Sequence, residues 1–179
     1  MIPRKPVIRN IALQPSRLKI FPLSMGATIN ARIIASNIHS ELMLLFPDEN
    51  EFLKARFDLF SRTLDSLHQS INSKLEGIEN RTFMIYHPAL TYYARDYALE
   101  QLSLEVDGKT PSPMHLKEMT DLAKVNNISK ILIQSQFDRK NAEILARETG
   151  SEIIQFDPLD LQWGDQMYYI AEQLNPTKR

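Results

Sequence analysis

Two residues of metal-binding types stand where predicted buried strands end. His87 follows the apolar run 82–86, and Asp157 follows the run 152–156. Imidazole and carboxylate are common ligands of Zn²⁺ and similar ions, whereas Mg²⁺ and Ca²⁺ require more oxygen ligands. In an open parallel sheet, ligands bind beyond the carboxyl ends of the strands. Because a closed zinc site normally has four ligands, the pair predicts one half of a metal or ligand site.

Each of these residues also has a simpler interpretation. His87 could be a strand-end histidine that is hydrogen-bonded to the backbone. Asp157 could cap the turn that follows it, because Asp-Pro is a common way to open a turn. We expect the other three histidines to be solvated surface residues of helices; they are His39, His68 and His115.

Composition limits the classes of protein that this chain could represent. Its 179 residues, 43% of them hydrophobic, suit one compact domain with an extension. Cysteine is absent, which excludes disulfides and thiolate metal sites. The sequence contains no apolar run long enough to predict a membrane-spanning helix. It also lacks a glycine-rich phosphate loop and a nucleophile elbow, so we do not expect an enzyme.

The first 40 residues differ in charge from the remainder. They contain six Lys or Arg and no acidic residue, which leaves 15 basic and 22 acidic residues elsewhere. These positive charges follow no helical face, so we expect no nucleic-acid partner. Residues 1–5 resemble the start of a signal peptide, but polar residues interrupt the apolar region that should follow. We expect residues 1–29 to be a poorly ordered basic leader without an export signal, and the chain as written to be cytoplasmic.

Two helices are predicted in the segment 30–76. The apolar positions of the first helix, which should end before Pro47, are Ile34, Ile38, Leu42 and Leu45. Pro47 should open the second helix, because proline and acidic residues are favoured in a first turn. The second helix should end at Gly77, and its apolar stripe consists of Phe57, Phe60, Leu64, Leu67, Ile71 and Leu75. Such a stripe packs on its own domain or pairs with a second copy.

After Gly77, short apolar runs alternate with helical patterns. The predicted strands are residues 82–86, 101–106, 130–134 and 152–156. The predicted helices are 88–99, one that begins at Ser112-Pro113, one that Asp138 can cap and Gly150 ends, and 165–174. We therefore predict an α/β fold: N-terminal helices, including one long connector helix, precede a lobe at 77–179 with a four-stranded, mainly parallel sheet flanked by helices.

The residues around His87 carry a resemblance to a known family. Residues 87–97 read HPALTYYARDY, which is similar to the H-x-A-F-x-Y-F-A-x-x-Y segment of the cluster A-I substrate-binding proteins of zinc and manganese ABC transporters. Further along, residues 111–113 resemble the family's E-P-S-P, residues 136–137 its P-Q-F, and residues 148–159 its E-T-G and D-P-L. The order and spacing of these motifs hold from about residue 30 to residue 174.

The resemblance implies two α/β lobes, joined by a long rigid helix, that hold a metal ion between them with two ligands each. His87 would be the third ligand and Asp157 the fourth. Family members that have histidine at the third position are linked with zinc, and members that have glutamate there are linked with manganese. This agrees with the preference of imidazole for zinc. We thus expect Zn²⁺, with Mn²⁺ as the alternative. The resemblance also implies a periplasmic or cell-surface location and a membrane permease as partner.

The chain departs from the family in three respects: residues 3–28 match nothing in it, and two of its motifs are changed. The family's H-x-W-x-x-P segment, whose histidine is the second ligand, should stand just before Asn30, but residues 23–28 read LSMGAT. Gln134-Ser135 stands where the family has E-P, which leaves the supporting role of that glutamate without a counterpart. We therefore expect a truncated or frameshifted zinc-uptake binding protein that supplies half of the metal site and binds metal weakly.

A second hypothesis comes from a different class of protein. If one lobe is missing, the apolar surface that it covered in relatives would be exposed, and such surface tends to associate. The alternative is therefore a structural or self-association module, or a fragment without metal capture.

Overall fold

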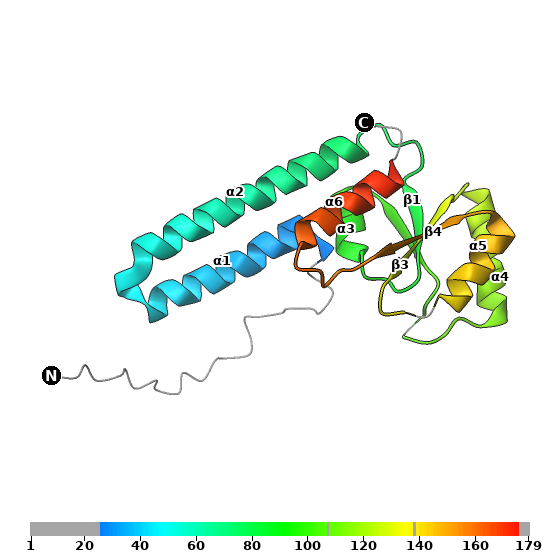
Figure 1. Ribbon diagram of the computed structural model, residues 1–179, viewed down its shortest axis with the longest axis horizontal. Coiled ribbons are helices and arrows are strands. Elements are labelled where there is room, and N and C mark those ends of the chain that lie inside the picture. The colour runs from blue at the N-terminus through cyan, green and yellow to red at the C-terminus, as the bar shows by residue number, and fades with distance from the viewer. Residues whose placement is uncertain (1–25, 107, 138, 176–179) are drawn as a thin grey trace.

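The chain forms a long helical hairpin attached to an α/β lobe. The computed structural model describes residues 26–106, 108–137 and 139–175. Figure 1 shows the two long helices lying side by side and extending away from the lobe. The expectation of a poorly ordered leader falls mainly on residues 1–25, which lie outside the described residues. No helix in the described ranges is long and apolar enough to cross a membrane.

The hairpin consists of α1 (Thr28–Leu45), the 3-10 turn η2 (Pro47–Glu49) and α2 (Asn50–Leu75). α1 begins two residues earlier than the predicted segment. Pro47 opens a separate turn and α2 starts at Asn50, because Phe46 and the turn redirect the chain between the two helices. Gly77 adopts a left-handed conformation with φ of 72° just after α2 ends, as a C-terminal stop requires.

The lobe is built on four parallel strands, which confirms the predicted fold class. β1 (Thr82–Ile85), β2 (Glu100–Ser103), β3 (Lys130–Gln134) and β4 (Glu152–Phe156) form a sheet in the order β2-β1-β3-β4. All three neighbouring pairs are parallel. The carboxyl ends of the strands therefore meet at one edge of the sheet.

Four helices connect and cover the strands. They are α3 (Thr91–Asp96), α4 (Pro113–Val125), α5 (Lys140–Thr149) and α6 (Trp163–Leu174). Ser112 caps α4 through a hydrogen bond that its Oγ accepts from the backbone N–H of His115, and Gly150 ends α5 with φ of 72°, both as predicted. Asp138, the predicted cap of α5, lies outside the described residues. α3 is shorter than the predicted helix 88–99, since Pro88 to Leu90 form a turn before it.

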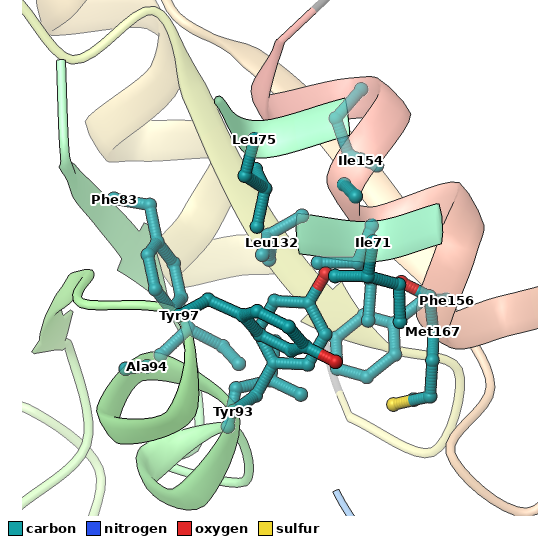
Figure 2. Packing of buried hydrophobic residues seen from close by; sticks show 14 residues of the cluster. Ile71, Leu75, Phe83, Tyr93, Ala94, Tyr97, Leu132, Ile154, Phe156 and Met167 are labelled. Atoms are coloured by element: carbon teal, nitrogen blue, oxygen red, sulfur yellow. The ribbon is translucent and has the colours of Figure 1, made fainter. Parts of the chain in front are cut away.

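Successive residues of the strands face opposite sides of the sheet, so the lobe has two apolar cores. On one side, Phe83, Ile85 and Leu132 pack against α2, α3 and α6. Figure 2 shows the rings of Tyr93 and Tyr97 meeting side chains of α2, α6 and the sheet in this core. On the other side, the strands pack against α4 and α5 in a cluster that includes Met84, Tyr86, Leu104, Ile131, Ile133, Ala142 and Leu145. Both faces of the sheet are covered.

A hydrogen-bonded cluster attaches the hairpin to the lobe. Thr28 Oγ1 lies 2.9 Å from His68 Nδ1 and 3.1 Å from the hydroxyl of Tyr97, and the same two groups of His68 and Tyr97 are 3.0 Å apart. The three residues come from α1, α2 and the end of α3. His68 is half-buried and its ring stacks on that of Tyr97, so the prediction of a solvated surface residue was wrong for this histidine. His39 is also half-buried, because its ring stacks on Phe57 of α2.

Removal of a core contact between hairpin and lobe should lower the stability of the whole chain. Ile71 of α2 is fully buried in the core shared with the sheet, so Ile71→Ala should reduce the free energy of unfolding by about 2–5 kcal/mol. Leu59→Ala, on the same helix at 51% exposure, should change it by no more than about 0.5 kcal/mol. Denaturant titration followed by circular dichroism measures both values. Equal effects would show that α2 is not anchored on the lobe.

The cluster also predicts how stability depends on alkaline pH. Burial raises the pKa of Tyr97 to about 12; nearby Asp96 also raises it, while the hydrogen bond with Thr28 lowers it. Because the pKa in the folded chain exceeds the ordinary value of about 10, the stabilisation is present below pH 10 and is lost as the pH rises through 12. Unfolding free energies measured over this interval should fall less for Tyr97→Phe than for the original chain. Tyr92→Phe is the control, and its unfolding free energy should fall as much as that of the original chain. If it falls only as little as that of Tyr97→Phe, the assignment of this pH dependence to Tyr97 is wrong.

Candidate metal site

His87 lies directly beyond β1 and is held by a buried carboxylate. Its Nδ1 is 2.8 Å from Oε2 of Glu105, which follows β2. The side chain of Glu105 is only 8% exposed, while that of His87 is 28% exposed. An ionised carboxylate only accepts hydrogen bonds, so this contact favours the tautomer that carries its proton on Nδ1. The lone pair of His87 is then on Nε2, the nitrogen through which it could bind a metal.

Two further contacts fix the position of His87. The ring of Phe137 stacks on the imidazole, with centroids 5.0 Å apart and planes within 16°. Gln134, the last residue of β3, donates a hydrogen bond from Nε2 to the carbonyl oxygen of His87 at 3.2 Å. This histidine is therefore held by its backbone, by one ring face and by one ring nitrogen. The simpler interpretation, a strand-end histidine bonded to the backbone, describes only the carbonyl group of His87. It does not account for the ring, whose Nε2 takes part in none of these contacts.

Asp157 lies directly beyond β4 and caps the next turn. Its Oδ1 accepts hydrogen bonds from the backbone N–H of Leu159 at 2.9 Å and from Nε2 of Gln136 at 3.1 Å. The turn-capping interpretation is thus correct for Oδ1. Neither contact uses Oδ2, which remains the oxygen of Asp157 that could approach a cation.

A cavity of about 390 Å³ opens at this edge of the sheet. His87 lines it, as do residues 158–160, which come directly after Asp157. Most of the remaining wall is apolar and comes from Gly26, Ala89, Leu90, Phe137 and Trp163. Gln134 also lines the cavity; it is 2% exposed, and its buried Oε1 has no hydrogen-bond partner among the described residues. The cavity therefore combines apolar walls with a few polar groups, as ligand sites commonly do.

The structure brings the two predicted ligands to one edge but not into a complete site. β3 lies between β1 and β4, so the backbones at His87 and Asp157 are separated by two strand spacings, ~10 Å. Within the described ranges, no group of three or more His, Asp or Glu side chains could hold a metal ion. His68 and His115 lie in other contacts, with Tyr97 and with Glu118. Among the described residues, at most two His, Asp or Glu side chains could bind the same ion.

Sequence reasoning missed Glu105, Gln134 and Gln136 as parts of the site. Glu105 falls inside an apolar run, and the unusual placing of an acid in a predicted buried strand was the available signal. Gln134 was noted only as a departure from the family's glutamate. Their contacts depend on which strands are neighbours, and the sequence alone does not specify that order.

Comparisons with known proteins identify the family of this chain. A family profile described as "Zinc-uptake complex component A periplasmic" matches residues 27–175. The chain is 28% identical over 134 residues to the high-affinity zinc uptake system protein ZnuA of Haemophilus influenzae, a match that covers 72% of this chain and 39% of that protein. It is 27% identical over 135 residues to the zinc-binding lipoprotein AdcA of Streptococcus pneumoniae, covering 74% of this chain and 27% of the lipoprotein.

Solved structures give the same result. A crystal structure of ZnuA superimposes with a TM-score of 0.84 at 31% identity, covering 88% of this chain and 62% of that chain. A zinc-bound ZnuA deletion mutant gives a TM-score of 0.82 at 32% identity, covering 92% and 64%. The chain thus spans less than two thirds of each of these proteins.

Proposed function

The chain belongs to the family of periplasmic zinc-uptake components that its motifs resemble, and we propose that it contributes His87 and Asp157 to the zinc site of a solute-binding protein. The observation that carries the proposal is the contact between His87 Nδ1 and Glu105 at 2.8 Å, because it leaves Nε2 as the free nitrogen of a residue that lines the cavity. A neutral imidazole with its second nitrogen hydrogen-bonded to a carboxylate is the usual form of a zinc-binding histidine.

The donor set favours zinc over the alternatives. One imidazole nitrogen and one carboxylate oxygen suit Zn²⁺, while Mg²⁺ and Ca²⁺ prefer more oxygen ligands. Mn²⁺ remains the second choice, since nitrogen ligands favour zinc over manganese in the general order of affinity. With two ligands from the described residues, the other positions would be filled by water or by groups from elsewhere, so we expect weak binding by this lobe alone.

Zinc would be the cargo of this protein and not a resident cofactor. In this role the lobe carries out no reaction; it binds an ion and presents it to the membrane permease of an ABC transporter. The family description and the lipoprotein relative support a periplasmic or cell-surface location for the working protein. Capture by one half of a cleft also agrees with the exposed position of the cavity at the edge of the sheet.

Zinc titration of the chain tests the proposal. The original chain should bind one Zn²⁺ more tightly than His87→Ala, Asp157→Ala, because the double variant loses both proposed ligands. The matched control is His115→Ala, Asp121→Ala, which removes one histidine and one exposed aspartate on α4 and should leave zinc affinity unchanged. Isothermal titration calorimetry measures all three. Equal affinity in the original chain and in the His87 and Asp157 variant would rule out this site.

Exposed apolar side chains support self-association as a second candidate function. Near the turn of the hairpin, Leu44 is 77% exposed and Phe52 is 56% exposed. Further apolar residues are exposed along the hairpin; they are Ile29, Ile33, Ile38 and Leu45 of α1, Phe46 of the turn, and Leu59 and Phe60 of α2. A helix with apolar residues on most of its sides is normally buried against another element. A second copy of the hairpin would supply such an element.

Light scattering tests self-association. At high concentration the original chain should have the mass of more than one copy, and Leu44→Gln, Phe52→Gln should shift the mass towards one copy because it removes apolar area from the contact. Leu161→Gln is the control, since Leu161 is fully exposed in the loop before α6 and does not lie at the turn of the hairpin. A monomer at all concentrations of the original chain would exclude this function.

A further inference from the structure

We propose that Glu105 is a positioning residue that fixes the tautomer and ring orientation of His87 for metal capture. The inference rests on the proposed function, and it names a residue outside the two expected ligands. Glu105 would not touch the metal. It would act through Nδ1 of His87 and keep the lone pair of Nε2 on the side of the cavity.

The strand register places the two residues side by side. Ile85 is the register partner of Ser103, an offset of 18 residues, and the same offset separates His87 from Glu105. Backbone pairing continues past the assigned strands: Leu104 N donates to Ile85 O, and Glu105 N donates to Tyr86 O, both at 2.9 Å. Glu105 is therefore held beside His87 by backbone hydrogen bonds that extend the β1–β2 pairing beyond the strands.

The burial of Glu105 favours one donor in this hydrogen bond, the N–H of the His87 ring. The side chain of Glu105 is 8% exposed, so its carboxylate has little access to water, and its bond with Nδ1 offsets part of the cost of burying the charge. The alternative tautomer would place an unprotonated Nδ1 opposite the carboxylate, which would put two acceptors 2.8 Å apart. That arrangement is unfavourable, so the neutral imidazole should carry its proton on Nδ1.

The ring cannot easily satisfy Glu105 in another orientation. Phe137 stacks on one face of the imidazole with planes within 16°, and Gln134 holds the carbonyl oxygen of the same residue. A flip that brought Nε2 to Glu105 would give up the present bond and turn Nδ1 away from its partner. Glu105 and Phe137 thus prepare His87 before any ion arrives, which lowers the entropy lost on binding.

The first test uses the metal-free chain. At about pH 8, long-range proton–nitrogen NMR correlations report which ring nitrogen carries the proton. For the original chain we expect His87 to be protonated on Nδ1. In Glu105→Ala the signal should move towards the tautomer protonated on Nε2. Protonation of His87 on Nε2 in the original chain would overturn the proposal without any variant.

The second test measures zinc affinity in variants of Glu105. Glu105→Ala should weaken binding about 10- to 100-fold, as is typical when the partner of a metal-binding histidine is removed. Glu105→Gln should retain most of the affinity and the Nδ1 proton, because the amide oxygen of glutamine can still accept from Nδ1–H. Glu100→Gln, at the exposed start of β2, controls for the loss of one negative charge and should have no effect.

The outcomes separate this inference from the proposed function. If Glu105→Gln loses as much affinity as Glu105→Ala, Glu105 is a direct ligand or a source of charge, and its positioning role is wrong. If the original chain binds no more zinc than His87→Ala, the proposed function fails, while the NMR result still decides the tautomer. Circular dichroism of each variant shows whether it is folded.

Discussion

Parallel pairing of the strands is the constraint on which the candidate site depends. A constant offset of 18 residues between β1 and β2 places Glu105 beside His87, and pairing of β3 with β4 places Gln136 near Asp157. Because all four strands run in the same direction, these side chains collect at one edge. A shift of one residue in the β1–β2 register would turn Glu105 to the opposite face of the sheet and leave the imidazole without its carboxylate.

The two apolar cores and the hairpin support the edge of the sheet at which the strands end. Covered on both faces, the sheet leaves mainly its edges and ends for binding. The start of the hairpin reaches the same cavity, since Gly26 lines it and a Cβ at that position would lie 2.8 Å from the carbonyl oxygen of Ala89. The Thr28, His68 and Tyr97 cluster then holds the first turn of α1 on the lobe. The start of the hairpin is thus in contact with the edge of the sheet that carries His87 and Asp157.

The sequence predicted the secondary-structure elements more accurately than the contacts between side chains. The bounds of β3 and β4 were predicted without error, because each is a short apolar run between polar residues. The parallel arrangement followed from the alternation of strands and helices. By contrast, the partner of His87 depends on the order of strands in space, which no local pattern encodes. His68 was misjudged for a similar reason. Helical periodicity located the part of the stripe that packs on the lobe, Leu67, Ile71 and Leu75, although Phe60 of the same stripe is exposed. It did not locate the second contact, which α1 makes with the flank of α2.

The position of bound zinc tests the central claim most directly. A crystal of the chain soaked with zinc salt can be measured at the zinc absorption edge, where anomalous scattering locates the ion. We expect a peak about 2.0–2.1 Å from His87 Nε2 and about 2.0–2.2 Å from an oxygen of Asp157, with Glu105 still bonded to Nδ1. A peak that contacts neither residue, or zinc bound directly to Glu105 in place of His87, would contradict it.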